Sequence, residues 1–338
     1  MFLLIRRMAI KSKFRFGLAA VIGVSLTLTV LCSGVLAAEK GQKSLQKTFA
    51  SPEEAAKALV AAASAEDVNE LLAVLGPAGD PLISSGDEVA DRQGRERFVR
   101  MYEEKNQIVK EGDEKAVLEV GNEAWPVPIP MVKAGGEWRF DTKEGKEEII
   151  NRRIGKNELS AIQVCLAYVD AQREYATKDR DRNGLLEYAQ KFGSEPGKKD
   201  GLYWQAKEGE EPSPLGPLAA QARTEGYTKK KAGDKPSPYH GYFYKILKAQ
   251  GKNAPGGAHS YVVKDKMIGG FGLVAYPASY GTSGIMTFIV NHDGMVYEKD
   301  LGKKTESLAK AMTTFDPDKS WRKIEGKYLE PSAPGGGS

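Results

Sequence analysis

The sequence predicts an α+β protein in which a small domain of helices and an antiparallel sheet precedes a long helix packed on an antiparallel β-meander. Apolar residues recur every three or four positions in 51–105 and again in 157–178, as they do in amphipathic helices. Short β-branched and aromatic segments, separated by turn residues, fill much of 116–140 and 242–299. The length of 338 residues favours two domains, and a content of 41% hydrophobic and 28% charged residues is typical of globular chains.

The first 38 residues have the three parts of a secretory signal peptide. Five basic residues and no acidic one come first, and 22 uncharged residues follow from Gly17 to Ala38, ending in small residues that suit signal peptidase. We therefore expect 1–38 to be cleaved and the mature protein to be periplasmic or secreted. Two alternatives stay open. An uncleaved anchor is one, because 22 residues are long enough to span a bilayer, and twin-arginine export through Arg6-Arg7 ranks behind the general secretory route.

Loss of the signal changes both the charge and the cysteine count. The whole chain has a formal charge of +4, but without 1–38 it has 44 basic and 45 acidic residues, so no global basic field attracts nucleic acid. Cys165 is then the single cysteine, which excludes an internal disulfide. It lies beside the apolar stripe of 157–178, where we expect a small buried hydrophobe. The mature chain is predicted to contain no membrane span.

The polar, lysine-rich residues 39–50 are predicted to be a linker, and 51–150 the first domain. Ser51 can cap the first helix, Pro52 suits its first position, and Glu54 completes a capping box. Further helices are predicted at 67–75 and 93–105, and strands at 116–120, 125–133 and 138–140.

Residues 151–325 are predicted to form the second domain. Its long helix covers 157–178, and a Gly- and Pro-rich segment, 193–238, is expected to make an irregular excursion across the surface. The turn 291–294 joins the last two strands as a hairpin. The low-complexity tail, 326–338, is predicted to be disordered. The strands of this domain are predicted at 242–247, 260–263, 271–276, 286–290 and 295–299.

One local motif predicts a calcium loop, and calcium is the only cofactor that the sequence indicates. The residues at oxygen-ligand positions one, three, five and nine of a twelve-residue loop are Asp179, Asp181, Asn183 and Glu187. Gly184 fills the sixth position, the long helix precedes the loop, and a second helix is predicted over 186–192. Gln190 at the twelfth position removes the bidentate carboxylate, so we expect a weak site. The alternative is a solvated, capped turn, in which Asp and Asn are common.

The chain has three histidines, and none is paired at metal-ligand spacing. Surface or hydrogen-bonding roles are the main interpretation for His240, His259 and His292. The alternative function is an extracytoplasmic hydrolase whose site lies between the domains and uses residues such as Asp141, His240 or His292. The scarcity of histidine and the absence of a nucleophile motif weigh against it.

Several stretches are distinctive: WPVPIP at 125–130, RRIGKNE at 152–158, KDGLYW at 199–204, and a block from MIGG at 267 to YEKDLG at 302. They resemble hallmark sequences of an exported bacterial family, domain of unknown function 2950, over about 45–325. The resemblance implies a cell-envelope protein. Because the family has no assigned reaction, it supplies no catalytic residues.

The C-terminal half has a second, weaker similarity. The helix that contains NELSAI at 157–162 and the strands around GYFY at 241–244 resemble the globular domain of type IV pilin-like proteins. This resemblance implies a long helix packed on an antiparallel sheet. The chain lacks the pilin cleavage motif and has a whole domain before the helix, so we do not expect it in a filament.

These observations predict an exported cell-envelope protein that acts as a non-enzymatic binding or assembly module. Its expected partner is another envelope protein, and nucleic acid is not expected to bind.

Overall fold

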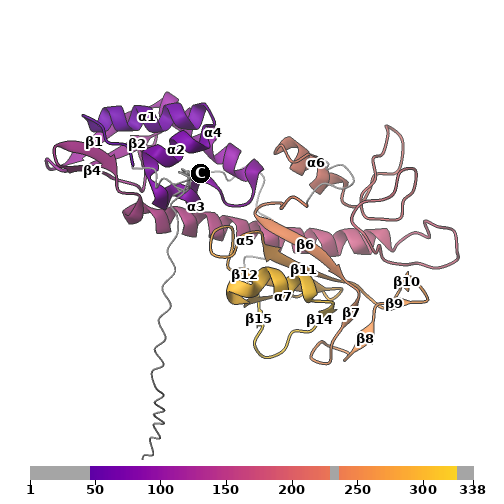
Figure 1. Ribbon diagram of the computed structural model, residues 1–338. Coiled ribbons are helices and arrows are strands. Elements are labelled where there is room, and N and C mark those ends of the chain that lie inside the picture. Colours follow the sequence, from indigo (N-terminus) through magenta and orange to yellow (C-terminus); the bar gives the residue numbers. More distant parts are fainter. Residues whose placement is uncertain (1–45, 229–235, 326–338) are drawn as a thin grey trace, which may run out of the picture. The chain divides into compact units, whose positions relative to one another are not determined.

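The computed structural model describes residues 46–228 and 236–325, and the statements below concern these ranges (Figure 1). The predicted signal peptide 1–38, the linker as far as residue 45, and the tail 326–338 lie outside the described residues. The described residues belong to one compact unit. No helix among them has both the length and the apolar character that crossing a bilayer requires.

Four helices open the described part of the chain, and the first begins where the sequence predicts. Ser51 Oγ accepts a hydrogen bond from the Glu54 N–H (3.2 Å), and Glu54 Oε2 accepts one from the Ala50 N–H (3.2 Å). Asp87 caps the fourth helix, which therefore starts five residues earlier than predicted. The helices are α1 (Pro52–Ser64), α2 (Val68–Leu75), α3 (Asp80–Ile83) and α4 (Glu88–Glu104), with a 3₁₀ turn η1 (Pro77–Gly79) before α3.

Helices α1, α2 and α4 contact an antiparallel sheet of strand order β1-β2-β4-β5, in which β3 also pairs with β2. Leu118 of β2, Met131 of β4 and Phe140 of β5 are fully buried beneath the helices. Strand β1 has a polar sequence and mostly exposed side chains, and for that reason its sequence gives no strand signal. The bounds are β1 (Asn106–Glu111), β2 (Lys115–Val120), β3 (Trp125–Pro126), β4 (Met131–Ala134) and β5 (Glu137–Phe140).

A single helix of 34 residues, α5 (Thr142–Tyr175), connects this sheet to the rest of the chain. The predicted domain boundary near residue 150 falls inside the helix, and the two-domain division stays a prediction. Buried side chains form one cluster within 55–140 and another within 161–324. Each half of the chain thus contributes its own hydrophobic core.

The second large sheet has the strand order β15-β13-β12-β11-β6, and α5 packs on it as predicted (Figure 1). Side chains of β11 alternate between two cores. Leu273 and Ala275 belong to the cluster that includes α5, whereas Val274 and Tyr276 pack with Ala309 of α7. Both faces of β11 are covered, so all six of its residues are buried. The bounds are β6 (Tyr242–Leu247), β11 (Gly272–Pro277), β12 (Met286–Asn291), β13 (Val296–Asp300), β15 (Arg322–Lys323), α7 (Thr305–Ala311) and the 3₁₀ turn η2 (Gly302–Lys304).

The α+β class is confirmed, and so is the predicted helix on an antiparallel sheet. The more specific likeness to pilin-like domains stays a prediction. Two smaller sheets flank the large one. One has three strands, β7 (Ala249–Gln250), β8 (His259–Ser260) and β14 (Thr314–Phe315). The other has two strands, β9 (Val262–Val263) and β10 (Lys266–Met267).

The predicted surface excursion 193–238 is partly a core element. Leu202, Trp204 and Leu215 are buried in the same cluster as α5. The segment also contains a helix, α6 (Gly216–Thr224). Its apolar residues are isolated and lack helical or strand periodicity, so the sequence pattern does not reveal their burial.

Candidate functional site

A buried carboxylate joins three distant segments of the chain. Asp87 is 1% exposed, and its Oδ1 accepts a hydrogen bond from the Ala90 N–H (3.1 Å) at the start of α4. Its Oδ2 accepts one from the Tyr227 hydroxyl (2.9 Å) and one from the Gly241 N–H (2.8 Å). Three donors stabilise this buried carboxylate, so Asp87 fixes the turns at 227 and 241 against α4.

His240 lies between those turns in a backbone conformation that non-glycine residues seldom adopt. Its φ is +50°, and its N–H donates to the Tyr227 hydroxyl (3.3 Å). The following residue, Gly241, has φ +74°, and a Cβ there would lie 2.4 Å from the Asn157 amide nitrogen. Strain of this kind persists only where the surroundings hold the backbone in place, and it concentrates at functional sites.

The imidazole of His240 faces a carboxylate and two aromatic rings. Its Nε2 lies 3.2 Å from Glu225 Oε2. The centroid of its ring lies 4.1 Å from that of Tyr239 and 6.0 Å from that of Tyr227. Burial lowers the pKa of His240, and the negative charges of Glu225 and Asp87 oppose that effect only in part. The ring is therefore neutral at neutral pH. We call Asp87, Glu225, Tyr227, Tyr239 and His240 the His240 cluster.

The His240 cluster has a base but no nucleophile. Among the described residues, no serine, threonine or cysteine side chain is hydrogen-bonded to His240. Nucleophilic catalysis requires such a pair. Asp141 precedes α5 and His292 packs on Tyr261 and Phe271, and within the described ranges neither contacts His240. The residues of the predicted hydrolase site are thus not brought together.

An apolar hollow of about 250 Å³ adjoins the His240 cluster through Tyr239. Burial raises the pKa of Tyr239, and the nearby charge of Glu225 adds to the shift. The Tyr239 hydroxyl is buried and has no partner at hydrogen-bond geometry within the described residues. The residues that line the hollow come from α5, α6, β6 and the segments beside them: Val164, Tyr168, Phe192, Leu215, Leu218, Pro236, Ser237, Tyr239, Phe243 and Tyr244.

The size of the hollow restricts what it can hold. Sites for drug-sized ligands and cofactors occupy about 300–1,000 Å³. A volume of about 250 Å³ is smaller, and it suits one large side chain inserted from outside. Its walls are mostly aromatic or aliphatic, so an apolar side chain would be preferred.

The predicted calcium loop is a capped turn whose carboxylates form ion pairs with Lys266. The Asp179 carboxylate accepts hydrogen bonds from the Asn183 N–H (3.1 Å) and the Gly184 N–H (2.8 Å). Lys266 Nζ donates to the carboxylate of Asp181 and to Glu187 Oε1 (2.9 Å). The hydrogen bond from Lys266 lowers the pKa of Asp181. The ammonium group thus already neutralises two of the predicted ligands.

The flanks of this loop differ from the prediction. Helix α5 ends at Tyr175, four residues before the loop, and 186–192 is not helical, because Tyr188 pairs as a β-bridge with Met267. Within the described ranges, no group of three or more acidic, histidine or cysteine side chains is arranged to hold a metal. Calcium binding by this loop stays a prediction.

Cys165 is where the sequence predicts it. The side chain is fully buried in the core between α5 and the second sheet. Burial raises the pKa of its thiol to about 12, so the group is not a thiolate near neutral pH.

The sequence indicates His240 as a functional residue only within the alternative hydrolase, and it does not reveal the partners of this side chain. Asp87 in the sequence Ser-Gly-Asp-Glu has the pattern of a helix cap, which it also is. Glu225 and Tyr227 lie in a segment without periodicity. The one signal in the sequence is the aromatic density around His240, where Tyr239, Tyr242, Phe243 and Tyr244 lie close together in the chain.

A family model described as "Protein of unknown function (DUF2950)" matches residues 46–324. No curated protein and no solved structure matches the chain. The match spans both halves of the fold and agrees with the resemblance noted in the sequence.

Proposed function

The chain belongs to the DUF2950 family of proteins of unknown function, and from this premise we propose that it is an exported, non-enzymatic binding module of the bacterial cell envelope. Its binding site is the apolar hollow beside Tyr239, which we call the aromatic hollow. Its ligand is an apolar or aromatic side chain of an envelope protein partner. The hollow beside Tyr239 is the observation that supports this proposal. A partner that inserts one large side chain would make the kind of anchored contact that dominates protein interfaces.

The His240 cluster supplies the polar rim of such a site. Tyr239 belongs to both features, and its buried hydroxyl lies beside the Glu225 carboxylate at the edge of the hollow. His240 and Glu225 have side chains that are 20% and 24% exposed, so both are accessible from solvent. An apolar pocket bordered by a few fixed polar groups gives affinity from the first and orientation from the second.

Site-specific photocrosslinking in the native envelope tests this proposal. A photoreactive phenylalanine analogue replaces Leu218, which lines the hollow, or Leu308, which is 47% exposed on α7 and serves as the matched control. We expect a discrete adduct from position 218 that Phe243→Ala weakens, and no such adduct from position 308. Identical adducts from both positions, or none from 218, would contradict the proposal.

Export is the second part of the proposal, and it rests on the charge and hydropathy pattern of residues 1–38. Amino-terminal sequencing of protein recovered from the periplasm or medium is expected to begin at Ala38 or Glu39. A chain that retains Met1 and sediments with membranes would instead support the uncleaved anchor.

A further inference from the structure

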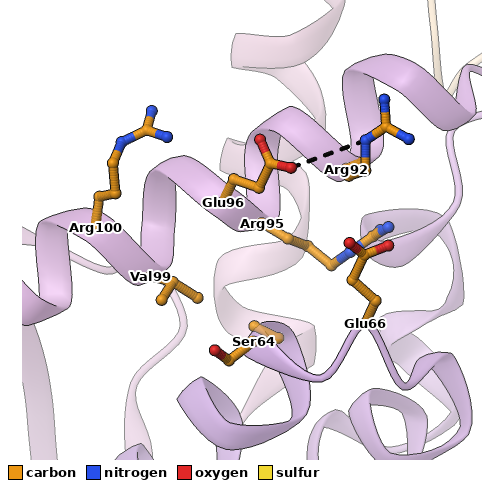
Figure 2. A pocket seen from close by; sticks show the side chains of 8 residues that line it. Ser64, Glu66, Arg92, Arg95, Glu96, Val99 and Arg100 are labelled. Carbon is orange, nitrogen blue, oxygen red and sulfur yellow. Dashed lines mark ion pairs between the residues drawn. The ribbon is translucent and has the colours of Figure 1, made fainter. Parts of the chain in front are cut away.

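Helix α4 borders a second hollow, of about 240 Å³ (Figure 2). Charged side chains line it, whereas among the described residues none lines the aromatic hollow. In Figure 2, Arg95 and Val99 extend from α4 toward Ser64 and Glu66 at the end of α1. We call this hollow the α4 groove. Its lining residues are Ala63, Ser64, Glu66, Arg92, Arg95, Glu96, Val99 and Arg100.

The arginines of the α4 groove are not equally paired. Arg92 Nε lies 3.8 Å from Glu96 Oε1, one turn further along the helix. Arg95 and Arg100 make no ion pair, hydrogen bond or ring contact within the described residues. Two guanidinium groups in the groove are therefore available to an external ligand.

The Nε of Arg95 separates this groove from an ordinary solvated helix face. That nitrogen is buried and has no hydrogen-bond partner within the described residues. A donor withdrawn from water without an acceptor destabilises the folded protein. A ligand oxygen that accepts a hydrogen bond from this nitrogen would remove that destabilisation. The ordinary interpretation of such a helix face is a row of solvated arginines, but in such a row every N–H group already donates to water.

We propose that the α4 groove binds an oxyanion, a carboxylate or phosphate group, through Arg95 and Arg100. A planar guanidinium offers parallel N–H donors that match two oxygens of either group. Val99 and Ala63 provide apolar surface for the carbon skeleton that bears the anion. The negative charges of Glu66 and Glu96, which also line the groove, oppose the ligand, so we expect an affinity on the order of millimolar.

Isothermal titration calorimetry of the purified protein tests this, with inorganic phosphate in one arm and succinate in the other. We expect saturable binding in at least one arm, and the arm that binds distinguishes a phosphate ligand from a carboxylate one. Arg95→Met and Arg100→Met should each weaken binding about tenfold, which corresponds to about 1.4 kcal/mol, because each removes a charged hydrogen-bond donor. Glu66→Gln should tighten it.

Arg97→Met is the matched control, because Arg97 is an exposed arginine of the same helix that does not line the groove. Circular dichroism confirms that each variant is folded, and Arg100→Met remains informative if Arg95→Met is not. Absence of binding in both arms would overturn the proposal. An effect of Arg97→Met equal to those of Arg95→Met and Arg100→Met would overturn it too, because the helix would then attract anions only by its overall charge.

Discussion

The loop 179–187 and the His240 cluster both gather acidic and polar side chains, but the molecule builds them in different ways. The loop is contiguous in sequence and largely exposed, and Lys266 neutralises two of its carboxylates. The His240 cluster combines residues from 87, 225–227 and 239–240, and its central carboxylate is 1% exposed.

The two regions differ in how firmly their polar groups hold the backbone in place. An exposed loop exchanges its partners with water at little cost. A buried carboxylate must keep its donors, and it therefore fixes the backbone that supplies them. The His240 cluster accordingly holds a strained residue next to a hollow, while the loop joins one surface segment to the β9–β10 hairpin.

Asp87→Ala should give the largest effect on stability. It leaves the Tyr227 hydroxyl and the Gly241 N–H without their acceptor, and we expect a loss of about 3 kcal/mol in the free energy of unfolding, measured with urea. Asp113→Ala, in the exposed β1–β2 turn, is the control and should remain close to the wild type. Equal losses in the two variants would contradict the account of Asp87 as the carboxylate that holds the His240 cluster together.

Tyr227→Phe should have a smaller effect, because it removes one donor and leaves Asp87 with two. We expect a loss of about 1 kcal/mol by the same measurement. Tyr280→Phe is a suitable control, since the Tyr280 hydroxyl makes an exposed hydrogen bond to Asp300. A Tyr227 variant as stable as this control would show that the cluster is not cooperative.

The pH dependence of stability should reveal His240. Because burial lowers its pKa in the folded state, the unfolded chain binds a proton more readily. The stabilising contribution is therefore complete above the unfolded pKa of about 6.5 and is lost as the pH falls through the lower, folded pKa.

We expect His240→Asn, in which asparagine tolerates the positive φ, to lose less stability than the wild type between about pH 7.5 and pH 5. Urea unfolding at a series of pH values measures this. Parallel pH profiles for the two proteins would contradict the account of His240 as a half-buried imidazole whose pKa is lowered in the folded state.

Lys266→Met should have the smallest effect on stability, since its ion pair with Asp181 is exposed and its ion pair with Glu187 is only partly buried. If the loop binds calcium, removal of the competing ammonium group should tighten that binding, which calorimetry with millimolar calcium measures. Gln190→Glu, which restores the twelfth ligand position, is the companion variant. No calcium heat in the wild type or either variant would end the calcium hypothesis.

Features that depend on neighbouring residues could be predicted from the sequence. The start of α1, the burial of Cys165 and the long helix over an antiparallel sheet follow from local patterns of capping and periodicity. These features depend on residues close together in the chain, and a single sequence displays them directly.

The sequence could not predict the partners of His240 or the hollow beside Tyr239. Asp87 and Gly241 are 154 residues apart, and nothing in their local sequences specifies the contact. The calcium motif illustrates the converse, because its local pattern is complete while Lys266, 85 residues from Asp181, alters its electrostatics. Long-range contacts determined the chemistry of both regions.

The most direct test of the central claim is a titration of the aromatic hollow with N-acetyltryptophanamide, which stands in for the inserted side chain of a partner. Calorimetry is carried out on the wild type, on Leu218→Glu in the hollow and on Leu308→Glu on α7. We predict saturable binding to the wild type and to Leu308→Glu, and loss of binding in Leu218→Glu. Binding that is absent from the wild type, or unchanged in Leu218→Glu, would contradict the account.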